Sequence, residues 1–207
     1  MIISHEKKFV FIHVPKTGGT SISTWLLKHP FCIKDGNKHA TAKEALGYFE
    51  EKGWPWAEYK KILVVRNPWA RAYSYYRFIM QYHGKKVIYP SWEDEINYVA
   101  SFKDFNDWVI NNPLEECMRH KGEKEIDYYR LYSYKDGYNL IDYPLQQERL
   151  SKDWKACCGF LGLNHESLGH HNKSNKLKSY QEVYSEKARK LIESRNSFVI
   201  KRFGYSF

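Results

Sequence analysis

Two short, uninterrupted apolar runs mark the strongest elements of this chain. Residues 9–14 and 62–65 are rich in β-branched and aromatic side chains, as expected for strands buried in a parallel sheet. The first run ends in a proline and two glycines, after which Ile22, Trp25 and Leu26 recur at helical spacing. A proline follows the second run, where the first turn of a helix accepts it. Each run therefore predicts a strand, a turn and a helix in succession.

The later segments show helical and extended patterns. Residues 91–130 are mostly helical in pattern, and residues 132–145 form short extended pieces around an Asp-Gly turn, which predicts a hairpin. Residues 150–163 predict a further helix that ends at a glycine. Aromatic residues make up 17% of the chain, a density that favours a folded domain over disorder. We expect an α/β fold in one domain, residues 1–207, with a P-loop NTPase-like parallel sheet flanked by helices.

The turn after the first strand carries the groups of an anion site. Gly18 and Gly19 allow a tight turn that aims backbone N–H groups inward. Lys16, Thr20 and Ser21 add one cation and two hydroxyls, and the following helix points its positive end the same way. In the P-loop of nucleoside triphosphatases the lysine follows the last glycine, whereas here it precedes both. The alternative is a glycine-rich turn that binds nothing.

A second candidate site follows the second strand. Arg66 lies at the carboxyl end of that strand, the edge at which open α/β sheets bind ligands. Ser74, eight residues later, can point from the next helix toward the same edge. A phosphate-metal enzyme usually has an aspartate near this position to hold magnesium. An arginine there indicates that protein cations alone neutralise the phosphate charge.

Together the two motifs resemble those of sulfotransferases that use 3′-phosphoadenosine 5′-phosphosulfate (PAPS), particularly the carbohydrate-type branch that acts on heparan and chondroitin. Residues 15–21 (PKTGGTS) are similar to the family's 5′-phosphosulfate loop, and residues 65–71 (VRNPWAR), with Ser74, to its 3′-phosphate site. The resemblance implies PAPS as cofactor, without a metal. The residues implied to hold it are Lys16, Thr17, Gly18, Gly19, Thr20, Ser21, Arg66 and Ser74.

Weaker similarity extends over residues 39–42, 147–150 and 172–205, so the resemblance covers nearly the whole chain. It implies transfer of a sulfuryl group to an acceptor hydroxyl, on a carbohydrate, and a variable helical region at about 80–130 on the acceptor side. Glu148 falls in a segment that is mainly structural in the family, which favours a packing or ion-pair role. The acceptor's identity and the oligomeric state stay open.

A catalytic base is expected between the two motifs. His39 precedes a helix that Thr41 and Glu44 predict to begin with a capping box. Histidine suits removal of a hydroxyl proton near neutral pH, and the resemblance implies a catalytic histidine in this interval. The alternative is a surface or hydrogen-bonding histidine at a helix start. His13, inside the first strand, is interpreted as a hydrogen-bonded core residue. Lys16 is expected to stabilise charge on the leaving phosphate.

Positive charge is concentrated near the end of the chain. The formal net charge is +9, and residues 170–207 hold nine Lys or Arg against three Glu. Lys173, in an irregular basic segment, is the candidate implied by the resemblance to fold over the 3′-phosphate. Such charge is also compatible with a polyanion- or nucleic-acid-binding protein, although no recognised signature of that class is present. A magnesium-dependent P-loop phosphotransferase is the other alternative.

The sequence also bears on location. Nowhere do 18 or more apolar residues run together, and no secretory apolar segment precedes the first strand. The four cysteines have neither zinc nor redox spacing. We therefore expect a bacterial, cytoplasmic enzyme with no membrane span and no specific nucleic-acid partner.

Overall fold

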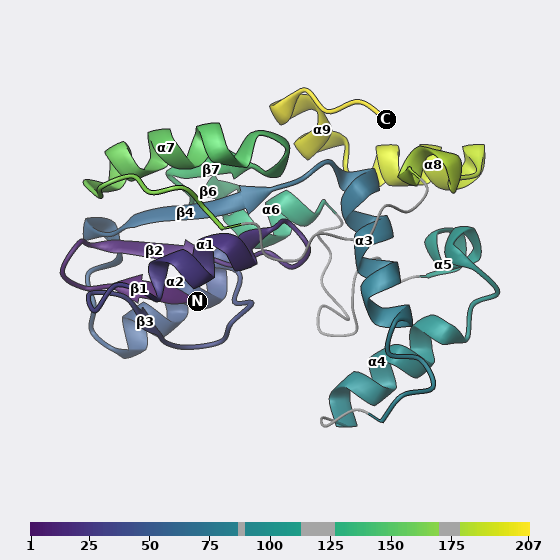
Figure 1. The fold of residues 1–207 in the computed structure, drawn as a ribbon, viewed down its shortest axis with the longest axis horizontal. Helices are drawn as coiled ribbons and strands as arrows, with labels where there is room; N and C mark the ends of the chain where they lie inside the picture. The colour runs from purple at the N-terminus through teal and green to yellow at the C-terminus, as the bar shows by residue number, and fades with distance from the viewer. Residues whose placement is uncertain (87–89, 113–126, 170–178) are drawn as a thin grey trace. The chain divides into compact units, whose positions relative to one another are not determined.

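The structure is a computed structural model that describes residues 1–86, 90–112, 127–169 and 179–207. The chain divides into two units. Unit 1 comprises Met1–Arg66 and Tyr129–Ser174, and unit 2 comprises Asn67–Tyr128 and Asn175–Phe207. Figure 1 shows the elements of each unit along the chain. Among the described helices, none has both the length and the apolar character needed to cross a membrane.

Unit 1 is built on a five-stranded mixed sheet in the order β3-β1-β2-β4-β7. Its strands are β1 (Ile2–Ser4), β2 (Phe9–Ile12), β3 (Ile33–Lys34), β4 (Lys60–Val65) and β7 (Tyr143–Gln146). Strands β2, β4 and β7 are parallel, with Ile12 opposite Leu63 and Val65 opposite Gln146. Strand β1 is antiparallel to both β2 and β3. The expected parallel sheet is confirmed for β2, β4 and β7 and wrong at β1, because the short connection between β1 and β2 permits only a hairpin.

The helices of unit 1 follow from local signals. The two glycines start α1, and the Thr41–Glu44 capping box starts α2. Gly162, with φ 71°, ends α7 as a left-handed C-cap. A second, two-stranded sheet is the hairpin predicted at Asp136-Gly137. The elements are α1 (Gly19–Leu26), α2 (Ala42–Glu51), α6 (Tyr128–Ser133), α7 (Leu150–Leu161), β5 (Tyr134–Lys135), β6 (Tyr138–Asn139) and the short 3-10 turns Trp56–Glu58 and Gln147–Arg149.

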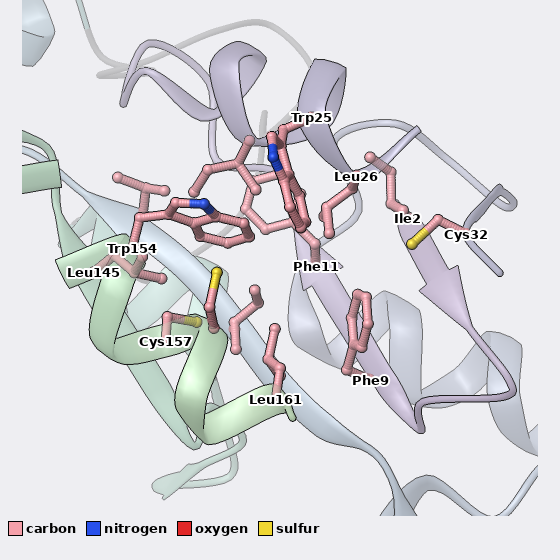
Figure 2. Packing of buried hydrophobic residues seen from close by; sticks show 14 residues of the cluster. Ile2, Phe9, Phe11, Trp25, Leu26, Cys32, Leu145, Trp154, Cys157 and Leu161 are labelled. Carbon is pink, nitrogen blue, oxygen red and sulfur yellow. The ribbon is translucent and has the colours of Figure 1, made fainter. Parts of the chain in front are cut away.

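One face of the main sheet packs against α1 and α7, as Figure 2 shows. Alternate residues of the parallel strands, such as Phe9, Phe11 and Leu145, meet side chains from both helices. Trp25 of α1 and Trp154 of α7 touch edge to face, with ring centroids 5.1 Å apart. This packing fixes the direction of α1, and hence of the loop that precedes it, against the sheet.

Unit 2 is helical in its described part. Its elements are α3 (Pro68–Met80), α4 (Pro90–Ala100), α5 (Phe105–Asn111), α8 (Glu186–Arg195), α9 (Ser197–Phe203) and a 3-10 turn at Tyr180–Glu182. The core includes Trp69, Phe105 and Trp108. Asn67 caps α3 by accepting hydrogen bonds from the N–H groups of Trp69 and Ala70, and it donates from Nδ2 to the carbonyl of Ser206 at 2.8 Å. The start of α3 is therefore tied to the last residues of the chain.

Candidate active site

The loop between β2 and α1 has the backbone form of an anion-binding nest. The φ angle is positive at Lys16 (65°) and Gly18 (82°) and negative at Thr17 between them. Alternation of this kind turns successive N–H groups toward one side. Gly18 is also the N-cap of α1, so the cap brings no side-chain acceptor to the first-turn N–H groups. The loop and the positive end of the helix could therefore serve one anion together.

Neighbouring side chains hold this loop in shape. Thr17, which is fully buried, donates from Oγ1 to the carbonyl of Val14 at 2.9 Å. Arg66 donates from Nη1 to the carbonyl of Lys16 at 3.0 Å. Left-handed backbone at a residue with a side chain is unfavourable by roughly 1–2 kcal/mol, which these two bonds offset. The Thr17 hydroxyl is thus engaged by the loop itself.

Lys16 carries a weakened charge. Burial lowers the pKa of its ammonium from 10.5 to about 8, and the Arg66 guanidinium adds a smaller effect in the same direction. The two cations therefore lie close enough for each to raise the free energy of the other. An anion between them relieves this repulsion and returns the proton to Lys16.

The three parallel strands bring these groups to one edge. The loop follows β2, Arg66 follows β4, and Gln147 follows β7. Because the carboxyl ends of parallel strands share an edge of the sheet, the three segments converge there. The side chain of Gln147 packs on the loop, since a Cβ built on Gly18 would lie 3.2 Å from its Cγ. The site is therefore assembled by sheet register from positions far apart in the sequence.

His39 lies against the same loop. Its Nδ1 is 2.8 Å from the carbonyl oxygen of His13. A carbonyl only accepts, so Nδ1 carries the hydrogen and, in the neutral ring, Nε2 carries the basic lone pair. The capping box of α2, in which Thr41 and Glu44 exchange hydrogen bonds, fixes the backbone two residues later. His39 is half-buried, and its tautomer suits a proton acceptor at Nε2.

A family model described as "Sulfotransferase family" matches residues 1–206. The chain belongs to the sulfotransferase family. It is accordingly a transferase that moves sulfuryl groups. No curated protein that was searched matches this sulfotransferase significantly.

The remaining predicted residues of the sulfotransferase are distributed over both units. Thr20 is exposed and Ser21 half-buried, both in the first turn of α1. Ser74 lies on α3 in unit 2 and is half-buried. Lys173 lies outside the described residues. Over the part of the chain that is described, no three His, Cys, Asp or Glu side chains gather in a way that could hold a metal ion.

Two residues that contribute to the candidate site were not predicted from the sequence. Gln147 contacts the loop, and the neighbouring Glu148 is exposed. Gln147 comes directly after the parallel strand β7, and that position is the signal that could have identified it. His13 is buried, as expected of a core residue, but it also contacts His39, with ring centroids 4.9 Å apart. That contact joins two distant segments and has no local signature.

Proposed function

We propose that this sulfotransferase takes PAPS as its donor and transfers the sulfuryl group to a carbohydrate hydroxyl. The observation that carries the proposal is the hydrogen bond from Arg66 to the Lys16 carbonyl. It joins the two motifs that resemble the 5′- and 3′-phosphate sites of the PAPS-dependent enzymes. A guanidinium stands directly after β4, where a metal-dependent phosphotransferase would have a carboxylate.

The residues present fit this donor. The nest at residues 16–18 and the start of α1 suit the 5′-phosphosulfate, with Thr20 and Ser21 as hydroxyl donors. Arg66 and Ser74 are assigned to the 3′-phosphate on the strength of the motif. Lys173 is assigned there by the same resemblance. When bound, the donor supplies a sulfuryl group activated by its anhydride link to phosphate.

In the proposed reaction one residue accepts a proton, and a second residue with the loop stabilises a negative charge. His39 accepts the acceptor's hydroxyl proton on Nε2 while the new oxygen–sulfur bond forms. The bond between sulfur and the bridging oxygen breaks, and that oxygen's charge is stabilised by Lys16 and the loop N–H groups. Since Lys16 is only weakly basic without a ligand, the developing negative charge strengthens its protonation at the moment it is needed.

The donor assignment is tested by isothermal calorimetry with 3′-phosphoadenosine 5′-phosphate, AMP and ATP, each with and without magnesium. We expect tight, metal-independent binding that requires the 3′-phosphate. The Arg66→Ala variant loses a charge-assisted contact of about 1.5–3 kcal/mol, so its affinity for the bisphosphate falls by roughly 10- to 150-fold. The affinity for AMP falls less, because AMP is affected only through the lost bond to the Lys16 carbonyl. Arg202→Ala, which removes an exposed arginine from α9, is the matched control and leaves both affinities unchanged.

Preference for ATP with magnesium would overturn the donor assignment. Equal loss of affinity for the bisphosphate and for AMP in Arg66→Ala would remove Arg66 from the 3′-phosphate. The acceptor is tested separately with [³⁵S]PAPS and unsulfated heparosan or chondroitin, and label on neither polymer, but on a phenol or peptide, would refute the carbohydrate assignment.

A further inference from the structure

The imidazole of His13 is enclosed on several sides by groups of the candidate site. It stacks on Phe11, with ring centroids 5.5 Å apart, and its Nδ1 lies 3.3 Å from Ser23 Oγ. A Cβ added to Gly19 would fall 2.7 Å from its Cδ2. The edge of the ring meets the ring of His39 at an interplanar angle of 61°. His13 is 6% exposed, so its position is fixed by packing on the strand, the helix and the loop.

Two imidazoles at this separation do not both hold a proton readily. Burial lowers the pKa of His13 to about 3, and the nearby charges of His39, Lys38 and the terminal amine act in the same direction. Ser23 is its hydroxyl partner on α1. His13 therefore stays neutral near pH 7. The two rings have different roles set by their surroundings.

We propose that His13 is a positioning residue for the base: its neutral ring fills the space between α1 and His39, and we call it the wedge. The wedge keeps the His39 Nδ1–H on the His13 backbone carbonyl. The lone pair of Nε2 is then left to accept a proton. This inference rests on the proposed role of His39. It also explains why each loop glycine is required: Gly18 adopts a positive φ, and Gly19 leaves space for the His13 ring.

The test compares His13→Ala with His13→Phe. Both keep the residue 13 carbonyl; alanine removes the wedge, whereas phenylalanine keeps a flat ring on Phe11 and loses only the bond to Ser23. Misplacing a catalytic group by about 1 Å lowers the rate by up to roughly a hundredfold. We expect kcat for sulfuryl transfer to heparosan or chondroitin to fall about 10- to 100-fold in His13→Ala. Affinity for 3′-phosphoadenosine 5′-phosphate should stay within about twofold, and His13→Phe should recover most of kcat.

A second readout needs no activity. The ¹⁵N chemical shifts of the His39 ring report which nitrogen carries the hydrogen. Wild type and His13→Phe should show the Nδ1–H form, and His13→Ala should show a mixture of tautomers. The control is His5→Ala, since His5 lies before β2 at the opposite end of that strand and bonds to the Tyr59 hydroxyl; kcat and the His39 tautomer should not change.

The outcomes separate the two proposals. An unchanged kcat or an unchanged His39 tautomer in His13→Ala overturns the positioning role, and so does a parallel loss of bisphosphate affinity, which would indicate a role in loop folding alone. A wild-type protein that neither binds the bisphosphate nor transfers sulfate contradicts the proposed function instead. In that case the tautomer measurement still decides whether His13 positions His39.

Discussion

Binding of the nucleotide should be accompanied by proton uptake at Lys16. With a pKa of about 8 in the unliganded protein, roughly half of the Lys16 side chains are neutral at pH 8 and about a tenth at pH 7. A bound phosphate restores the charged form, because an opposite charge in contact with an ammonium raises its pKa. The expected uptake is therefore about 0.5 proton per site at pH 8 and about 0.1 at pH 7.

Calorimetric titration with 3′-phosphoadenosine 5′-phosphate in HEPES and in Tris measures this uptake, since the two buffers differ in ionisation enthalpy. The phosphates of the ligand have second pKa values near 6, so at pH 8 they are already ionised and contribute little. Lys16→Arg keeps a charge that does not titrate in this range and should abolish the uptake. Lys43→Arg, at an exposed position of α2, is the control and should leave it unchanged.

Absence of proton uptake in the wild type at pH 8 would refute the reasoning about Lys16. So would the same uptake in Lys16→Arg, which would assign the proton to another group, such as His39. The sign of the linked stability effect follows from the same shift. Between about pH 8 and 10.5 the unfolded chain binds more protons at Lys16 than the folded one, so this residue makes the unliganded protein more stable as pH rises through that interval.

Three further predictions concern stability, measured by urea unfolding. Gly19→Ala should destabilise unit 1 by about 1–3 kcal/mol because the new Cβ overlaps the His13 ring. The control, Gly159→Ala on α7, places its Cβ where no atom lies within 4 Å and should stabilise unit 1 by about 0.5–1 kcal/mol. Equal effects of the two substitutions would contradict the packing of His13 on Gly19. Thr41→Ala should lose about 1 kcal/mol from the α2 cap, and Thr41→Ser should retain it. Asn67→Ala should lose about 1–2 kcal/mol through the α3 cap and the bond to the chain end, and an unchanged midpoint would show that the cap is replaceable.

Elements whose structural cause is local were predicted correctly from the sequence. The strand at Phe9–Ile12, the α2 capping box and the end of α7 at Gly162 each depend on residues within one or two turns. Strand β1 was missed because three residues carry no measurable alternation, and only pairing with β2 makes them a strand. Strand β7 contains Pro144, which argues against a central strand but is tolerated here because β7 lies at an edge of the sheet.

In the candidate site, too, the features with a local cause were predicted and the long-range contacts were not. The loop motif and Arg66 were predicted because glycine, lysine and arginine at the ends of apolar runs have a direct chemical meaning. The contacts of Gln147 with Gly18 and of His13 with His39 depend on strand register and on the path of the 27–40 connection. No spacing rule relates residues so far apart, so these contacts required the structure.

Hydrogen bonds within the protein hold the loop in its nest conformation. The left-handed residue Lys16 is held by a bond to its own carbonyl from Arg66, and the buried Thr17 hydroxyl closes the turn on Val14. The N–H groups are therefore oriented before a ligand arrives, and no reorganisation is required when charge develops on a leaving oxygen. The same arrangement places the Arg66 charge close enough to weaken that of Lys16. The Arg66 hydrogen bond to the loop and the smaller, Arg66-dependent part of the lowered Lys16 pKa thus have one structural cause. Replacing Arg66 should therefore alter the affinity for the 3′-phosphate and, to a lesser extent, the proton uptake at Lys16.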